Sequence, residues 1–469
     1  MRRIVLLLLV ISLLTGLTVT INGDEGSFGR RGRAPGARLV TPVLSIRRFA
    51  PALVDIQARS KLRTSLDAIF DDPALASWTK GSCMVARAGG RIVYERRPGA
   101  PVIPASTLKL LTAIAALRVL GPTTRLTTVL RADRKPAQGV LAGDLQVVGG
   151  GDPIIETDER AAMNPRQPVV RTRMEDIAKA VQDAGITRIA GGVRADERRY
   201  DTERVRPGWK ASYQRDGDVA PLSALLVDDG QTIDGTPVAN PALHFAQILT
   251  SELRAIGVTV DGAPSVGRAG DGPVVTSVDS LSVEDMVGEL LRESDNTTAE
   301  LLVKEMGRRA TGGDAVGTTD QGLAAARTAL AGAGLDLTGL DEKDGSGLDR
   351  SDRATCSLLA GSLATAGRRS TVAESLPLAG RTGTLQKRFV GTSVEGRLRA
   401  KTGTLNGVAA LAGWVDPIGA GAPLAFAVVS NDVPPSLPVT RLADKVGVAL
   451  GAWPAAPPVG DLDPEPLQQ

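Results

Sequence analysis

The sequence predicts an α+β fold in which an antiparallel sheet is covered by helices and interrupted by an inserted β-rich domain. Two hairpin patterns predict the sheet. The stretch CMVARAGGRIVYER places two short alternating apolar runs on either side of Gly89 and Gly90, which is typical of a β-hairpin. Near the other end, AALAGWV and PLAFAVVS are strand-like runs joined by a turn of Gly, Pro and Asp. Because hairpins join antiparallel strands, both ends of the chain are expected to contribute to one sheet.

The middle of the chain is the third observation. Residues 125–274 are rich in Gly, Pro and short Val, Leu or Ile runs, such as GVLAGDLQVVGGGDP and ITRIAGGVRAD. These runs predict short strands and turns with some helix, so we expect a separate inserted domain. Helical patterns accompany the sheet, an apolar one at residues 108–120 and another at about residues 437–450.

These patterns divide the chain into consecutive parts. Residues 1–23 form a hydrophobic N-terminal segment and residues 24–50, with GRRGRAPGAR, a flexible linker. Residues 51–124 and 275–452 together form the domain that contains the sheet, and residues 125–274 form the inserted domain. Residues 453–469 form a proline-rich tail.

The N-terminal segment is typical of an export signal. Arg2 and Arg3 precede an uncharged, largely apolar run from Ile4 to Ile21. The run is close to bilayer-spanning length and no small-x-small cleavage site follows it, so it is either a cleaved signal peptide or an uncleaved membrane anchor. We therefore expect the protein outside the cytoplasm, secreted or associated with the membrane through this segment.

Composition excludes several classes of function. The 469 residues include 55 basic and 52 acidic side chains, a net charge of +3, and only 3% are aromatic, so nucleic-acid binding is not expected. One histidine and two cysteines are too few ligands for a zinc or iron-sulfur site, and we expect no metal and no cofactor. In an exported chain, Cys83 and Cys356 either form one disulfide or remain two free buried thiols.

The candidate nucleophile lies in PASTLKLLTAIAALRVLG, residues 104–121. This helix is apolar almost all round, which is typical of a core helix, yet Lys109 stands in its first turn, where a cation opposes the helix dipole. At i, i+3 spacing the Lys109 amine can approach the Ser106 hydroxyl, and a lysine with a lowered pKa can act as its base. A second S-x-x-K string, Ser77 to Lys80, precedes a glycine and a strand, so we favour Ser106.

A second candidate string connects two predicted helices. One helix starts with an S-x-x-D pattern at Ser282, and the other with a T-x-x-E capping box from Thr297 to Glu300. Between them lies the only S-x-N in the chain, Ser294 and Asn296. Fixed between two helices, this hydroxyl and this amide can bridge a lysine amine and a substrate amide.

The third string begins an apolar strand. In RAKTGTLNGVAALAGWV, Lys401 and Thr402 offer a cation and a hydroxyl to a substrate carboxylate, and Gly403 allows a close approach of the backbone. GRTGTL at residues 380–385 is a near copy with arginine, which we interpret as a chance recurrence.

Together and in this order, the three strings resemble the motifs of penicillin-binding proteins and serine β-lactamases. Ser106 and Ser294 are 188 positions apart (294 − 106), too many for a compact β-lactamase. The chain resembles the D-alanyl-D-alanine carboxypeptidase/endopeptidase family of class C, type-4 penicillin-binding proteins, which carries an extra domain at this place. GDLQVVGGGDP (143–153), DGSGLDR (344–350) and RAKTGTL (399–405) are also similar to that family. The chain departs from it at residues 379–385 and at residues 227–230.

The resemblance implies a serine DD-peptidase fold, with helices on both faces of an antiparallel sheet, and an acyl-enzyme mechanism. Ser106 is expected to attack a terminal D-alanyl-D-alanine bond, with Lys109 as base and Lys401 lowering the pKa of Lys109 by like-charge repulsion. The other roles carried over are proton relay and peptide binding by Ser294 and Asn296, binding of the substrate carboxylate by Lys401, Thr402, Gly403 and Thr404, and an oxyanion hole from the N–H groups of Ser106 and Thr404.

The implied partners are peptidoglycan stem peptides and β-lactams, the latter as covalent inhibitors, in the cell wall or periplasmic space. Two alternatives stay open: a serine β-lactamase, which turns penicillin over quickly, and a catalytically silent wall-binding protein. The balance between carboxypeptidase and endopeptidase activity also stays open.

Overall fold

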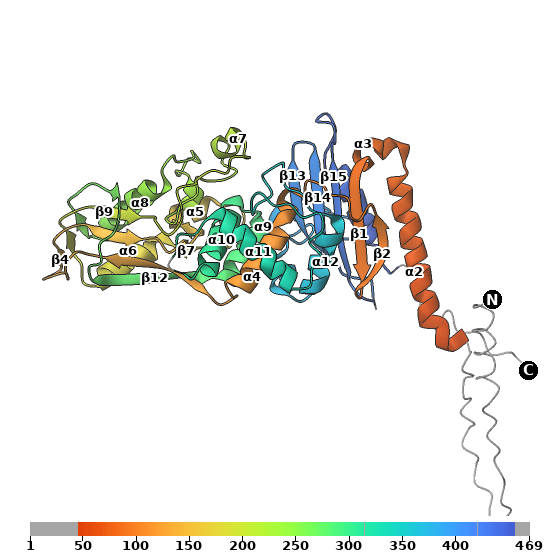
Figure 1. Cartoon of the computed structure of the whole chain (residues 1–469), viewed down its shortest axis with the longest axis horizontal. Helices are drawn as coiled ribbons and strands as arrows, with labels where there is room; N and C mark the ends of the chain where they lie inside the picture. The colour runs from red at the N-terminus through yellow and green to blue at the C-terminus, as the bar shows by residue number, and fades with distance from the viewer. Residues whose placement is uncertain (1–45, 314, 420, 455–469) are drawn as a thin grey trace, which may run out of the picture. The chain divides into compact units, whose positions relative to one another are not determined.

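A five-stranded antiparallel sheet organises the two ends of the chain, in the computed structural model that describes residues 46–313, 315–419 and 421–454 (Figure 1). Its strand order is β13-β14-β15-β1-β2. The strands are β1 (Gly81–Ala88), β2 (Arg91–Arg96), β13 (Leu398–Leu405), β14 (Val408–Val415) and β15 (Leu424–Asn431). Because β1 pairs with β15, both predicted hairpins belong to one sheet, and the predicted α+β fold is confirmed.

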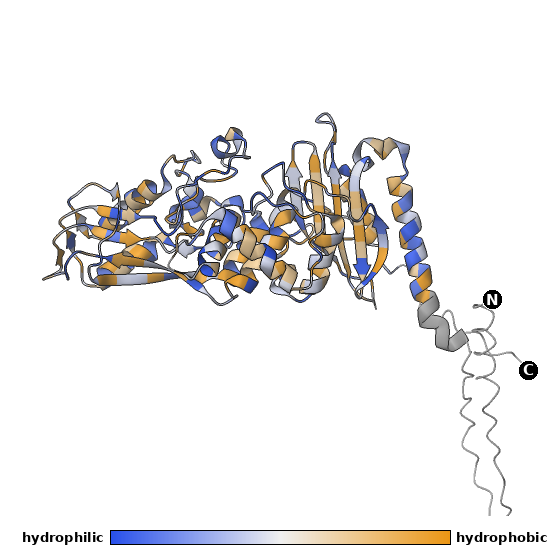
Figure 2. Ribbon diagram, viewed as in Figure 1, coloured by the Kyte–Doolittle hydropathy of each residue, from blue (hydrophilic) through white to orange (hydrophobic). Residues whose placement is uncertain are grey.

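Helices cover both faces of this sheet, which explains the apolar strands (Figure 2). In β15, Leu424, Phe426 and Val428 pack into one core and the alternate residues into the other. One face carries α4 (Lys109–Val119), α9 (Val283–Glu293), α10 (Asn296–Ala310), α11 (Thr319–Gly332), α12 (Cys356–Ala366) and α13 (Thr371–Ser375). The other carries α2 (Ile46–Phe70), η1 (Pro73–Leu75), α3 (Ala76–Thr79) and α14 (Arg441–Leu450).

Two helix starts differ from those predicted. The helix expected from residue 437 begins at Arg441, because Pro438 lacks the N–H group that a helix interior requires. Helix α2 begins at Ile46, inside the segment 24–50 that we interpret as a linker.

The middle of the chain contains three further sheets, and its core packs against α6 (Met174–Asp183) and α8 (Pro241–Ala255). The first has the order β11-β9-β5-β3-β12, the second β10-β8-β4 and the third β6-β7. Strand β12 pairs with β3 and carries the first of these sheets past residue 274 to Ser282, so the division at residues 125 and 274 stays a proposal. The strands are β3 (Arg125–Arg131), β4 (Val140–Leu141), β5 (Leu145–Val148), β6 (Ile155–Glu156), β7 (Thr172–Arg173), β8 (Arg188–Ile189), β9 (Val193–Asp196), β10 (Thr259–Val260), β11 (Ser265–Val266) and β12 (Val274–Ser282), with short helices α5 (Asp158–Met163), α7 (Ala211–Arg215) and η3 (Asp228–Gly230).

The two predicted helix caps around residue 295 have different outcomes. The capping box of Ser282 before α9 is confirmed. The cap from Thr297 to Glu300 is wrong, because α10 begins at Asn296 and its N-cap is Asp295, whose side chain accepts from the N–H of Thr298. Aspartate is as good an N-cap as threonine, and here it comes two residues earlier. Asn296 is therefore the first residue of a helix rather than part of a loop.

Cys83 on β1 and Cys356 at the start of α12 form a disulfide, with their Cα atoms 5.9 Å apart. It joins residues 273 positions apart and ties the sheet to a helix of its core. Of the two alternatives for these cysteines, the structure has the disulfide.

Replacing both cysteines with alanine is expected to lower the free energy of unfolding by about 2–4 kcal/mol, because the open chain gains conformational entropy when unfolded. Chemical denaturation with and without a reductant measures this. The reductant should destabilise the wild type and leave the Cys83→Ala/Cys356→Ala variant unchanged, and equal effects on both proteins would contradict the prediction.

The predicted N-terminal signal or anchor, residues 1–23, lies outside the described residues, as do most of the linker and the tail from residue 455. In the described part of the chain, no helix combines the length and the apolar character needed to cross a membrane.

Candidate active site

The predicted nucleophile lies on a tight turn rather than inside a regular α-helix. Ser106 belongs to the 3-10 helix η2 (Ala105–Leu108), and Lys109 is the first residue of α4. Since side chains at i and i+3 eclipse in a 3-10 helix, the Lys109 amine lies 3.1 Å from the Ser106 Oγ. Ala105, directly before the nucleophile, has a φ of 46°, which non-glycine residues rarely adopt and which is often found at functional sites.

Two further hydrogen bonds hold the Lys109 amine. It donates to the Asn296 Oδ1 at 2.5 Å and to the backbone carbonyl of Ser346 at 2.7 Å. The side chain is fully buried, as the apolar pattern around it predicts. The structure therefore brings the first two motifs together at one amine.

Burial lowers the pKa of Lys109 to about 8, although the surrounding carboxylates, Asp344 foremost, act in the opposite direction. This corrects the expected cause: desolvation rather than repulsion from Lys401 lowers the pKa. The repulsion acts on the other partner, because burial and then the charge of Lys109 hold the pKa of Lys401 well below its ordinary value. An amine whose pKa lies close to neutral pH, and which lies beside a hydroxyl, is suited to abstract the hydroxyl proton.

The third motif meets the second through Ser294. The fully buried Lys401 on β13 donates to the Ser294 Oγ at 2.7 Å and to the carbonyl of Thr402 at 2.8 Å. Ser294 ends α9 with a φ of 68°. A left-handed residue that is not glycine is uncommon at such a position, and here its side chain contacts the lysine.

A backbone carbonyl of the middle region fixes the orientation of Asn296. Its Nδ2 donates to the carbonyl of Asp218 at 2.7 Å, so the Oδ1 atom is left to face Lys109. The middle region thus contacts a predicted site residue directly.

Gly403 lies against the turn of the nucleophile. A Cβ atom at this position would stand 3.0–3.1 Å from the carbonyl of Pro104 and the backbone nitrogens of Ser106 and Thr107, so any side chain would crowd the turn. Thr402 is nearly buried, whereas the side chain of Thr404 is exposed. All eight predicted site residues therefore lie on the three segments that meet at this turn, with Thr404 the most open to solvent.

Sequence reasoning missed Thr384, in the near copy GRTGTL. This residue lies in η4 (Gly383–Leu385), and its hydroxyl accepts from the Thr402 Oγ1 at 2.9 Å. The string interpreted as a chance recurrence thus contacts the third motif. The carbonyls of Asp218 and Ser346 were also missed, since any residue type supplies a carbonyl and no sequence signal marks them.

Replacing Thr384 with valine is expected to reduce kcat/KM on a stem peptide about fivefold, because the orientation of the Thr402 hydroxyl loses about 1 kcal/mol of support. Steady-state kinetics of Thr384→Val, Thr402→Val and the double variant measure this. The effects should be less than additive, whereas full additivity would show that the two hydroxyls act independently.

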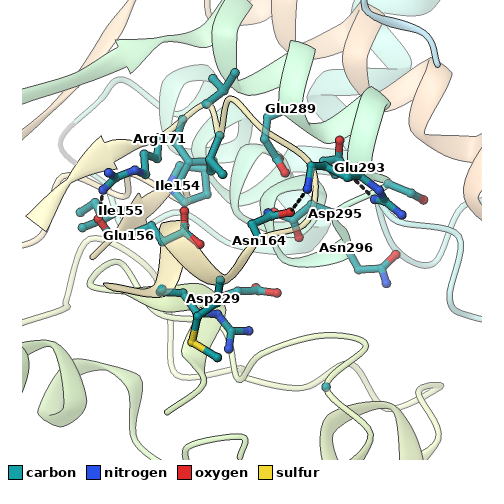
Figure 3. A pocket seen from close by; sticks show the side chains of 18 of the residues that line it. Ile154, Ile155, Glu156, Asn164, Arg171, Asp229, Glu289, Glu293, Asp295 and Asn296 are labelled. Atoms are coloured by element: carbon teal, nitrogen blue, oxygen red, sulfur yellow. Dashed lines mark hydrogen bonds and ion pairs between the residues drawn. The ribbon is translucent and has the colours of Figure 1, made fainter. Parts of the chain in front are cut away.

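A cavity of about 650 Å³ adjoins the second motif (Figure 3). Residues 153–171 of the middle region form one wall, and the connection between α9 and α10, including Ser294 and Asn296, forms the other. The side chains of Glu156, Asp229 and Glu289 lie around it. A volume of this size is within the range of ligand pockets, so the S-x-N segment has space beside it for part of a peptide.

The chain is similar to known carboxypeptidases. The chain is 30% identical to the D-alanyl-D-alanine carboxypeptidase of Actinomadura sp. (strain R39), in an alignment of 513 positions that covers 91% of this chain and 92% of that protein. It is 32% identical over 405 residues to carboxypeptidase DacB of Mycolicibacterium smegmatis, over 82% and 83% of the two chains.

The fold also matches a solved structure. Penicillin binding protein 4 (dacB) from Haemophilus influenzae has a TM-score of 0.68 and 19% identity, over 80% of this chain and 97% of that chain. The family model for D-Ala-D-Ala carboxypeptidase 3 (S13) matches residues 62–237 and 234–447. The chain therefore belongs to the D-Ala-D-Ala carboxypeptidase 3 (S13) family and is a serine-type carboxypeptidase.

Proposed function

We propose that this protein releases the terminal D-alanine of peptidoglycan stem peptides through an acyl-enzyme on Ser106. The arrangement around the Lys109 amine is the observation that carries the proposal. Two of its neighbours, the Asn296 Oδ1 and the Ser346 carbonyl, only accept hydrogen bonds. A neutral amine donates its two hydrogens to them, which turns its lone pair toward the Ser106 hydroxyl.

Acylation then follows from this geometry. As the Ser106 Oγ attacks the carbonyl carbon of the D-alanyl-D-alanine bond, its proton passes to the Lys109 amine. The peptide C–N bond breaks, the leaving D-alanine amine takes up the proton that Lys109 accepted, and the stem peptide remains as an ester on Ser106. Water then attacks the ester, restores the hydroxyl and releases the shortened peptide.

The third motif is suited to the substrate carboxylate. Lys401 supplies the positive charge, Thr402 and Thr404 supply hydroxyls, and Gly403 lets the strand pack closely against the turn that carries the nucleophile. We assign the oxyanion hole to the N–H groups of Ser106 and Thr404, which the resemblance implies. We assign proton relay to Ser294, whose hydroxyl accepts from Lys401.

The site of action is outside the cytoplasm, as a cell-wall peptidase requires. The disulfide supports this location, since disulfides persist in oxidising compartments. We assign stem peptides as the substrate and β-lactams as covalent ligands of Ser106, and we retain N-terminal membrane association as part of the proposal.

The deciding experiment labels the purified protein with a fluorescent penicillin and maps the adduct by peptide mass spectrometry. We expect one long-lived adduct on the peptide that contains Ser106, together with release of D-alanine from a pentapeptide. Rapid loss of the adduct with hydrolysed penicillin would indicate a β-lactamase. Neither adduct nor D-alanine would indicate a silent wall-binding protein, and an adduct on Ser77 would overturn the choice of nucleophile.

A further inference from the structure

Glu300 is a fully buried carboxylate that the mechanism above does not use. It lies on α10, four residues after Asn296, so both side chains extend from the same face of that helix. Its Oε1 accepts from the N–H groups of Gly345 at 3.0 Å and of Ser346 at 2.8 Å. Both contacts go to one short loop.

The same loop holds the base. The Ser346 carbonyl accepts from the Lys109 amine at 2.7 Å, and the Gly345 carbonyl accepts from the Thr112 hydroxyl at 2.6 Å. Both acceptors face α4, one at the base and one three residues further along. Because each peptide group is planar, the bond to the Ser346 N–H fixes the direction of the Gly345 carbonyl. The Ser346 carbonyl shares its plane with the Gly347 N–H, which donates to the Asp344 Oδ1 at 2.7 Å. Glu300 thus anchors Ser346 at its N–H, and Asp344 sets the direction of its carbonyl.

Helix α10 therefore holds Lys109 in two ways. Asn296 contacts the amine directly, and Glu300 contacts it through the loop. A general base must keep its hydrogen-bond geometry to the nucleophile, and a displacement of about 1 Å costs about 10²-fold in rate.

Glu300 and the Lys109 amine also interact through their charges. The negative charges that face the Lys109 amine raise its pKa, whereas burial acts against its charged form. Burial and the neighbouring Asp344 raise the pKa of Glu300 to about 8. The charged groups around the amine are Asp344 and Asp352 from the segment after α11, Asp295 before α10, Glu300 on α10 and Lys401 on β13.

We propose that Glu300 is a positioning residue of Lys109: its carboxyl group anchors Ser346, whose carbonyl holds the amine, and adds a negative charge near the amine when it is ionised. This inference rests on the proposed function, because it assigns Lys109 as the base. A merely structural role predicts a less stable protein with an unchanged base, so the two interpretations differ in their kinetics.

The test compares two variants of Glu300 with variants of Glu305 in the same helix. Glu305 is also a buried carboxylate, but it bonds Arg199 and Tyr200 of the middle region instead of the loop. The rate of acylation by a fluorescent penicillin is measured against pH for the full chain. Thermal unfolding gives the stability of each variant.

Glu300→Leu is expected to slow acylation about 10²-fold at the optimal pH, because the loop loses its acceptor. Glu300→Gln keeps an acceptor for both N–H groups and should restore most of the rate. At about pH 8 and above, where Glu300 ionises, the variant lacks this negative charge near the amine, so its rate should rise at lower pH than that of the wild type. Glu305→Leu and Glu305→Gln should lower stability without moving the pH profile.

Three results would overturn the proposal: a wild-type rate in Glu300→Leu, equal losses in Glu300→Leu and Glu305→Leu, or an unmoved pH profile in Glu300→Gln. The last comparison decides even where Glu300→Leu does not fold. Failure of the proposed function is a different result, because the wild type itself would then form no adduct on Ser106.

Discussion

Replacing Lys109 with methionine is expected to slow acylation of Ser106 by penicillin about 10³-fold, the usual loss for a general base. Methionine matches the length of the lysine stem but cannot take the serine proton. The Asn296 Oδ1 and the Ser346 carbonyl lose their donor at the same time. Stopped-flow measurement of adduct formation gives the rate, and thermal unfolding shows how stable the variant is.

Lys109→Arg separates the base from the charge. Arginine keeps the positive charge and can donate to the same carbonyls, but it does not deprotonate at accessible pH. We expect it to acylate about as slowly as Lys109→Met. Lys80→Met, in the second S-x-x-K string, should acylate at the wild-type rate. Fast acylation by Lys109→Arg would show that the amine acts only through its charge.

The pH profile of the wild type is part of the same prediction. The pKa of Lys109 is about 8, below the ordinary value for lysine because burial disfavours its charged form. The amine is protonated below this pH and neutral above it, so the acylation rate should rise with pH through about 8. This rise should be absent from Lys109→Met, and a profile unchanged by the substitution would exclude Lys109 as the base.

The sequence predicts the sheet because most of its strands can be recognised from a pattern in their own residues. Gly89 and Gly90 between alternating runs predict β1 and β2, and two apolar runs predict β14 and β15. The start of α10 was mispredicted because two good caps lie close together, and local propensity does not choose between Asp295 and Thr297. The pairing of Cys83 with Cys356 was left open, since it depends on the packing of β1 against α12.

The site divides in the same way. Lys109 was predicted because a buried cation contradicts the apolar pattern around it. No single string assigns a site role to Ser294, Asn296 or Lys401. Their assignment depends on the three strings together and on the family resemblance. Glu300 and Thr384 were assigned to a cap and to chance, because their roles depend on residues distant in sequence. The Ser346 carbonyl has no side-chain signature at all.

Replacing Gly347 with alanine is expected to slow acylation about 10²-fold through displacement of the nucleophile. Gly347 has a φ of +83°, and a Cβ atom there would lie 2.1 Å from the carbonyl oxygen of Ala105. Ala105 immediately precedes Ser106 and already has a φ of 46°. The turn therefore has to move away from the loop, which also carries the Ser346 carbonyl. Acylation kinetics and chemical denaturation together measure the effect.

Gly334→Ala is the matched control, because it separates backbone strain from this contact. Gly334 has a φ of +79°, and no described heavy atom lies within 4 Å of its would-be Cβ. Both substitutions should cost about 1–2 kcal/mol of stability for the left-handed conformation, but only Gly347→Ala should slow acylation. Equal rates in the two variants would mean that the turn tolerates the displacement. A selective loss at Gly347 would show that the acylation rate depends on the packing of the 344–347 loop against Ala105.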